Sequence, residues 1–270
     1  MALKLPLQPF SRPVPEVHLA DAPVARVLVQ LRFPASTGLI TDNTALTRIA
    51  AALANQYPTY QEGVEASFQF AGMGQAPATS SHKTVTVKSS SGKTAVTVSP
   101  TSITYQSSEY ESRVALLREL EAVLAVAMPV VRPSSFDRIG VRYSNLFPRD
   151  ERLALNVKSA IFEAEQIAQE GVTLQQSISE TVYKIDATTA LLVRSALLPA
   201  GAVIDPGLVA PAGSSGTFLL DLDGFTPGST ADTEPHEVLA KIENLAEVAS
   251  GYFLWSLTEE GAKAFGADSR

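Results

Sequence analysis

Phe-Asp-Arg-Ile-Gly-Val-Arg-Tyr-Ser-Asn-Leu-Phe occupies residues 136–147 and is followed by Pro148. Side chains with period two point to the same face of a strand, and the apolar residues of this segment recur at that spacing. Residues 24–34, VARVLVQLRFP, are a second β-rich run that also ends at a proline. We therefore predict that Val24–Phe33 and Phe136–Leu146 are strands in equivalent positions of two superposable halves.

Helices and further strands are predicted after the first of these strands. The spacing of Leu46, Ile49 and Leu53 indicates a helix with one apolar face. A second helix is predicted from the capping-box spacing Ser108-x-x-Glu111, with Met128-Pro129 as its end. Its inward residues are predicted to be Val114, Leu117, Leu120, Leu124 and Ala127. Short strands are expected between the two helices, at 66–70, 83–89, 94–99 and 102–106.

The second half is predicted to repeat this order. A less regular helical region is expected within 149–170, and residues 199–216 are expected to be loops. The most regular helix is predicted to begin near Glu234, with Pro235 in its first turn. Its apolar face is predicted to include Ile242, Ala249 and Phe253. Strands are expected at 172–185, 190–198 and 217–223.

Both halves thus follow a β-α-β(3-4)-α pattern, which predicts an α+β fold. We expect one curved antiparallel sheet with helices packed on one face. This organisation resembles the duplicated TATA-binding-protein-like and helix-grip folds. The predicted boundaries are an extended proline-rich arm at 1–16, a first half at 17–133, a second half at 134–264 and a tail at 265–270. The arm is expected either to pack on its own domain or to dock a partner.

Several short motifs also resemble one protein family. They are the early Arg32-Phe33-Pro34, the mid-chain strand 138–145, the late Asp221-Leu222-Asp223, and a closing helix with His236 and Phe253. Together they resemble a sporadically distributed bacterial family of about this length. The resemblance covers about residues 17–260, and it implies the fold described above without implying an activity.

Composition and charge exclude several function classes. The 270 residues include 28 Asp and Glu against 21 Lys and Arg, which argues against a general nucleic-acid binder. The chain has no cysteine, and this excludes disulfides, thiolate metal sites and cysteine nucleophiles. Prolines interrupt the opening residues, and no later stretch is long and apolar enough for a membrane span. We therefore expect a cytoplasmic protein.

The polar face of the 136–147 strand is the first candidate site. Period-two geometry puts Arg138 and Arg142 on this face and Tyr143 and Asn145 on the other. Two neighbouring guanidiniums are suited to hold an anion or a carboxylate. A ladder of ion pairs with acidic residues on adjacent strands explains the same pattern without a ligand. Both interpretations stay open.

The acidic motif Asp221-x-Asp223 is the second candidate. Both carboxylates point to the same face of a strand, an arrangement that suits a hard divalent cation. Solvent exposure or pairing with basic residues accounts for it equally. We predict no metal and no cofactor, because no further ligand motif accompanies it.

Two function classes follow. The favoured hypothesis is a non-catalytic binding or accessory protein that engages a protein or peptide partner through the sheet surface or its edges, with homo-oligomerisation as an option. The alternative is a ligand-binding protein or an enzyme with a pocket between sheet and helices and an arginine clamp for an anionic ligand. Such a pocket, or simply the core, is expected to contain Tyr105, Phe136, Tyr143, Phe253 and Trp255.

Overall fold

The computed structural model describes residues 5–14, 17, 19–35, 39–40, 42, 44–69, 78–150, 152–163, 172–205, 207–212 and 216–267. These residues form an α+β fold around a nine-stranded antiparallel sheet in the order β2-β3-β4-β5-β1-β6-β11-β8-β7. The sheet strands are β1 (Val24–Arg32), β2 (Thr59–Gln69), β3 (Ala78–Lys88), β4 (Thr94–Ser99), β5 (Ser102–Ser107), β6 (Arg138–Pro148), β7 (Ser177–Lys184), β8 (Ala190–Leu198) and β11 (Thr217–Phe225).

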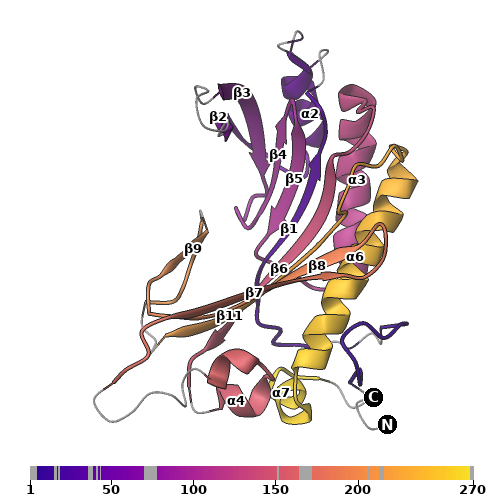
Figure 1. Cartoon of the computed structure of the whole chain (residues 1–270). Coiled ribbons are helices and arrows are strands. Elements are labelled where there is room, and N and C mark those ends of the chain that lie inside the picture. Colours follow the sequence, from indigo (N-terminus) through magenta and orange to yellow (C-terminus); the bar gives the residue numbers. More distant parts are fainter. Residues whose placement is uncertain are drawn as a thin grey trace.

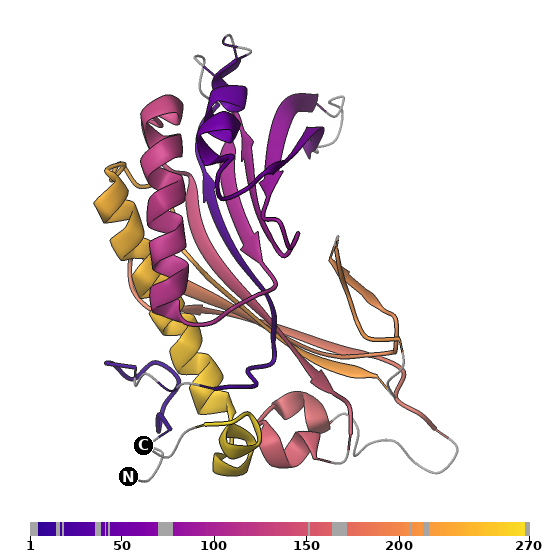
Figure 2. The same ribbon diagram turned by 180° about the vertical axis from the view of Figure 1, so that it is seen from behind.

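Helices cover one face of this sheet, as Figures 1 and 2 show from opposite sides. Three helices do so: α2 (Ala45–Leu53), α3 (Arg113–Val131) and α6 (Pro235–Ser256). Shorter elements near one end are α4 (Leu153–Asn156), the 3-10 helix η1 (Ala160–Phe162) and α7 (Glu259–Ala264). On the opposite face, which we call the open face, stands a hairpin of β9 (Val203–Asp205) and β10 (Leu208–Val209).

Alternation along the central strands explains why the described helices gather on one face. Val27 and Val29 of β1 and Ile139 and Val141 of β6 point toward the helices and are buried. Leu222 of β11 continues this row. Removing such side chains from water stabilises the fold by about 1.5–3 kcal/mol each, and this drives the helices onto the sheet.

The two strands predicted to be equivalent lie side by side at the centre of the sheet. β1 and β6 pair in antiparallel fashion, with Val29 opposite Val141 and Arg32 opposite Arg138. Outward from this pair the order is β5, β4, β3, β2 on one side and β11, β8, β7 on the other. Both predicted halves therefore contribute to a single sheet.

The limits of α3 differ from the prediction. The helix begins at Arg113, because Ser112 rather than Ser108 accepts the capping hydrogen bond, from the backbone amide of Ala115. It continues through Pro129 to Val131 and ends at Arg132, whose φ of 44° is left-handed. A proline this close to the end removes one amide donor but leaves the preceding turns intact. The inward face is largely the predicted one, since Leu120, Leu124 and Ala127 are buried, but Val114 is exposed and Leu116 is buried instead.

The last helix also buries a slightly different face from the one predicted. Ile242 and Ala249 are buried as expected, but Phe253 is only half-buried. Leu254 is the buried residue in that turn. The helix packs on the sheet near Gly224, where a Cβ atom would approach the carbonyl oxygen of Leu245 to 2.9 Å.

Two connecting regions differ from the prediction, and one agrees with it. The first difference is the long antiparallel β2–β3 pair. Its strands span 59–69 and 78–88, where shorter strands at 66–70 and 83–89 were predicted; residues 70–77 lie outside the described part. The less regular helical region predicted within 149–170 is present, because α4 and η1 lie there among its described residues. Within the predicted loop 199–216, β9 and β10 form the hairpin on the open face.

The described part of the proline-rich arm packs on its own domain. The Phe10 ring lies 5.2 Å from the ring of Tyr183 and 6.1 Å from that of Tyr252, between centroids. Val14 is buried against Gly251 of α6, where a Cβ atom would come within 2.9 Å of Val14. These contacts support the first of the two roles considered for the arm.

Candidate functional site

Polar side chains from β6 and β11 meet on the open face near the centre of the sheet. The antiparallel register places Ser144 opposite Asp221 and Arg142 opposite Asp223. Because directly opposed residues point to the same face, the two arginines and two aspartates singled out in the sequence come together. They form a network of ion pairs with residues of β1, β7, β8 and the hairpin.

Asp221 is the buried centre of this network. Its side chain is 2% exposed, and both carboxylate oxygens accept from Nε of Arg142 at 2.9 Å. Ser144 Oγ donates to Oδ1 at 2.9 Å, and Arg194 Nη1 lies 3.8 Å from Oδ2. A buried carboxylate is tolerated only with such compensation, so these contacts are required for the fold.

Asp205 connects the hairpin to the sheet. Its Oδ2 lies 2.7 Å from Nη2 of Arg26 on β1 and 2.8 Å from Nη2 of Arg142 on β6. The hairpin thereby receives two charged contacts from the two central strands. Apolar packing adds to them, because Ala202 and Ile204 rest on a small cluster from β8 and β11 on the same face.

Arg138 and Asp223 form the second pair of the network. Arg138 Nη2 donates to Asp223 Oδ2 at 2.7 Å, and its guanidinium carbon lies 5.0 Å from the centre of the Phe225 ring. Gly140 makes this arrangement possible, since a Cβ atom there would collide with the guanidinium of Arg138. The second oxygen of Asp223, Oδ1, is buried without a hydrogen-bond partner among the described residues.

The charges of the network balance. Arg194 of β8 also contacts Glu180 of β7, with Nη2 2.7 Å from Oε2. The four guanidiniums therefore face four carboxylates, those of Glu180, Asp205, Asp221 and Asp223. An anion would have to displace a carboxylate that is already in place, so this geometry serves structure better than capture of an anionic ligand.

Burial and charge act in opposite directions on these groups. Burial by itself lowers the pKa of Arg142, but the carboxylates of Asp221, Asp205 and Asp223 outweigh it and leave that pKa raised. Burial raises the pKa of Asp223 above its usual value, and Arg138 offsets this only in part. The charge of Asp223 is thus only partly compensated by its arginine partners.

Tyr143 and Asn145 do not belong to this site, although sequence reasoning grouped them with the arginines. Both lie on the opposite face of β6 and are buried. The Tyr143 ring packs edge-on against that of Tyr110 at 5.3 Å between centroids. Asn145 donates to the carbonyl oxygen of Leu220 at 3.0 Å. Their surroundings give them a structural role in the core.

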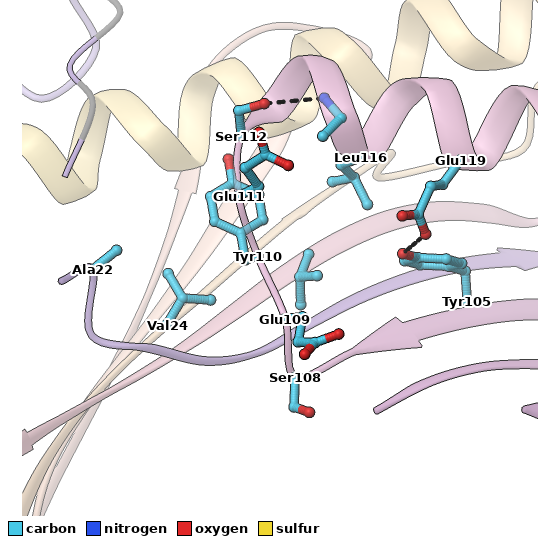
Figure 3. A pocket seen from close by; sticks show the side chains of 12 residues that line it. Ala22, Val24, Tyr105, Ser108, Glu109, Tyr110, Glu111, Ser112, Leu116 and Glu119 are labelled. Carbon is cyan, nitrogen blue, oxygen red and sulfur yellow. Dashed lines mark hydrogen bonds between the residues drawn. The ribbon is translucent and has the colours of Figure 1, made fainter. Parts of the chain in front are cut away.

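A separate pocket lies between the sheet and the start of α3, with a volume of about 560 Å³. Figure 3 shows Tyr105 and Glu119 on one side, joined by a hydrogen bond of 2.5 Å, and the segment 108–112 across from them. The lining is acidic, with glutamates at 109, 111 and 119. The arginines of the network lie on the other face of the sheet, so the expected arginine clamp does not line this pocket.

Sequence reasoning missed Asp205 and Arg194 as members of the network, whereas period-two spacing along 138–145 places Ser144 on the face of Arg138 and Arg142. A signal for Asp205 was present, because Val203-Ile204-Asp205-Pro206-Gly207-Leu208-Val209 places Pro-Gly between two short apolar runs. That pattern is typical of a hairpin. Gly207 has a φ of 79°, a conformation that glycine adopts without strain. No local pattern marks Arg194.

The described residues hold no group of three or more His, Asp or Glu side chains placed to bind a metal ion. None of the helices among them is long and apolar enough to cross a membrane. No protein-family model matches the chain, and no curated protein matches it. The family resemblance noted in the sequence therefore stays a prediction. The fold and the site define an α+β protein whose one uncovered sheet face carries a neutral ion-pair network and a tethered hairpin.

Proposed function

We propose that this chain is a non-catalytic binding protein that holds a protein partner on the open face of its sheet, beside the β9–β10 hairpin. The observation that carries the proposal is the hairpin itself. Val203 is 75% exposed and Val209 51% exposed, although both belong to an element that is anchored on the sheet. Exposed apolar side chains on a fixed element are a common feature of protein interfaces.

The ion-pair network supports this role by holding the hairpin in place. Asp205 receives contacts from Arg26 and Arg142, so the hairpin is positioned before a partner arrives. A preformed binding element loses less conformational entropy on association, which raises affinity. The polar, uncovered face around the hairpin supplies the rim that surrounds an apolar contact in such interfaces.

Capture of a partner from a lysate of the source organism tests the proposal. The immobilised chain should retain a protein that the double variant Val203→Ser/Val209→Ser loses. Val64→Ser is the matched control, because Val64 is an exposed valine on the distant edge strand β2. Equal retention by all three forms would show that the hairpin is not the binding element.

The pocket supports a second candidate, a small-ligand-binding protein. Its volume is within the usual range for ligands, and Glu111 and Glu119 favour an organic amine over the anion first considered, while Glu109 is already paired with Lys93 at 2.8 Å. Thermal shift assays with amines and with matched carboxylates test it. Stabilisation by amines that is lost in Glu111→Gln would support this candidate, and stabilisation by carboxylates would contradict it.

We also propose that the two halves arose by duplication. The matching order of strands outward from β1 and β6 supports this idea. Superposition of β1–α3 on β6–α6 tests it: α3 should fall on α6, and a placement over different strands would argue against a common origin.

A further inference from the structure

The strand β7 is an edge of the sheet in the described part of the chain. It pairs with β8 along its whole length, from Ser177 opposite Leu197 to Lys184 opposite Ala190. No strand in the described part of the chain pairs with its other side. The segment contains no proline, and its register to β8 is regular, so its outward backbone amides and carbonyls are available for pairing.

The side chains on the open face of β7 follow a self-complementary pattern. Glu180 lies directly opposite Arg194, whose side chain is on the open face, so Glu180 is on that face as well. Because side chains alternate along a strand, Val182 and Lys184 also lie on it. Val182 is 60% exposed. Lys184 is exposed and makes no ion pair with any described residue. Arg194 donates both of its hydrogen bonds to Oε2 of Glu180, so Oε1 of Glu180 can form an ion pair with a further cationic side chain.

A second copy of the same strand satisfies this pattern in one antiparallel register. When Val182 lies opposite its symmetry mate, Glu180 of each copy lies opposite Lys184 of the other. The interface then contains one valine pair and two oppositely charged pairs, each of which stabilises cross-strand pairing. A register centred on Glu180 would instead oppose two carboxylates, which is unfavourable. Charge thus selects the Val182-centred register.

The other edge of the sheet, β2, shows no such complementarity among its described side chains. On β2, Glu62 is already paired with Lys83 of β3 at 2.8 Å and accepts from Tyr60. Its charge is therefore satisfied within the chain, whereas no described residue pairs with Lys184 of β7. The comparison favours β7 as the edge that pairs.

We propose that two copies of this chain pair through β7 about a two-fold axis at Val182, so that the sheets join into one continuous antiparallel sheet. A two-fold axis perpendicular to the sheet keeps both helix layers on one side and both open faces on the other. The inference does not depend on the partner proposed above, because β7 and the hairpin are different elements. It assigns a second copy of the chain as the binding partner of strand β7.

Cysteine cross-linking tests the register directly, since the chain has no native cysteine. Directly opposed residues of an antiparallel pair have Cα atoms about 4.5–5.5 Å apart, within reach of a disulfide. Under mild oxidation, Val182→Cys should form a covalent dimer. Val64→Cys on β2 is the matched control and should stay monomeric. Cross-linking of both variants, or of neither, would overturn the proposal.

Charge variants test the electrostatic part by analytical ultracentrifugation. Lys184→Glu should raise the dimer dissociation constant about tenfold, because two attractive pairs become repulsive. Glu180→Lys alone should act in the same way. An equimolar mixture of the two variants should recover a heterodimer, since each new lysine then faces a new glutamate. Melting temperatures near that of the wild type would confirm that both variants are folded.

Two results would overturn the proposal in these measurements. One is a wild-type chain that sediments as a monomer at its highest soluble concentration. The other is a dimer whose dissociation constant is unchanged by Lys184→Glu and whose Val182→Cys variant forms no disulfide. That result would place the dimer contact on another surface. Neither result bears on partner capture by the hairpin, so the two proposals fail separately.

Discussion

Nη2 of Arg142 lies 2.8 Å from Oδ2 of Asp205, and this contact ties the β9–β10 hairpin to the central strand of the sheet. The same guanidinium holds the buried Asp221 on the adjacent strand. Arg142 therefore serves two purposes, which are compensation of a buried charge and attachment of an element on the surface. These two purposes can be separated by mutation.

Removing Asp221 or Arg142 is expected to destabilise the fold strongly. Arg142→Ala leaves the 2% exposed carboxylate of Asp221 without its main partner, at an expected cost of about 3–5 kcal/mol in the free energy of unfolding. Asp221→Ala should cost a similar amount. The double variant should cost less than the sum of the two, as urea denaturation can measure. Strict additivity would show that the pair is not coupled.

Asp205→Ala is expected to loosen the hairpin without unfolding the domain. Asp205 is partly exposed and makes its charged contacts to Arg26 and Arg142, while the core on the helix face is untouched. Hydrogen exchange at 203–209 should accelerate, and the exchange of β1 and β6 should be unchanged. A melting temperature that falls as far as in Arg142→Ala would contradict this separation of roles.

Asp223→Asn is expected to reveal a pH dependence with a defined sign. Burial raises the pKa of Asp223 above 3.8, so the folded state resists ionisation and the wild type loses stability as the pH rises from 3.8 through that higher value. The asparagine variant does not titrate. Its free energy of unfolding relative to the wild type should therefore increase across that window and then level off. A relative decrease would mean that the folded pKa is lowered instead.

Two buried tyrosines are expected to respond in opposite ways to loss of the hydroxyl. Tyr57 is 2% exposed and its hydroxyl has no partner among the described residues, while burial, with Glu119 nearby, raises its pKa to about 12. Tyr57→Phe should stabilise the fold by about 1 kcal/mol. Tyr105→Phe removes the hydrogen bond to Glu119 and should destabilise by about the same amount. Thermal denaturation of both variants checks the contrast.

Period-two and helical spacing determined which residues form the core of the central elements. Val27, Val29, Ile139 and Val141 are apolar at every second position, and such a row has only one stable placement, against a helix layer. The α+β class and the antiparallel sheet follow from these local patterns. The separation of Arg138 and Arg142 from Tyr143 follows from the same alternation.

Tertiary structure alone decided which charged side chains meet and which side chains of a helix face are buried. Arg142 reaches Asp221 and Asp205 because β6 lies beside β11 and beneath the hairpin, and neither neighbour is encoded near it in the sequence. The exposure of Val114 and the burial of Leu116 on α3 were decided in the same way, by how this helix packs against α2 and α6. Local spacing specifies the direction of a side chain within its own element. The energy of a buried charge or a packed face depends on atoms that only the folded chain brings near.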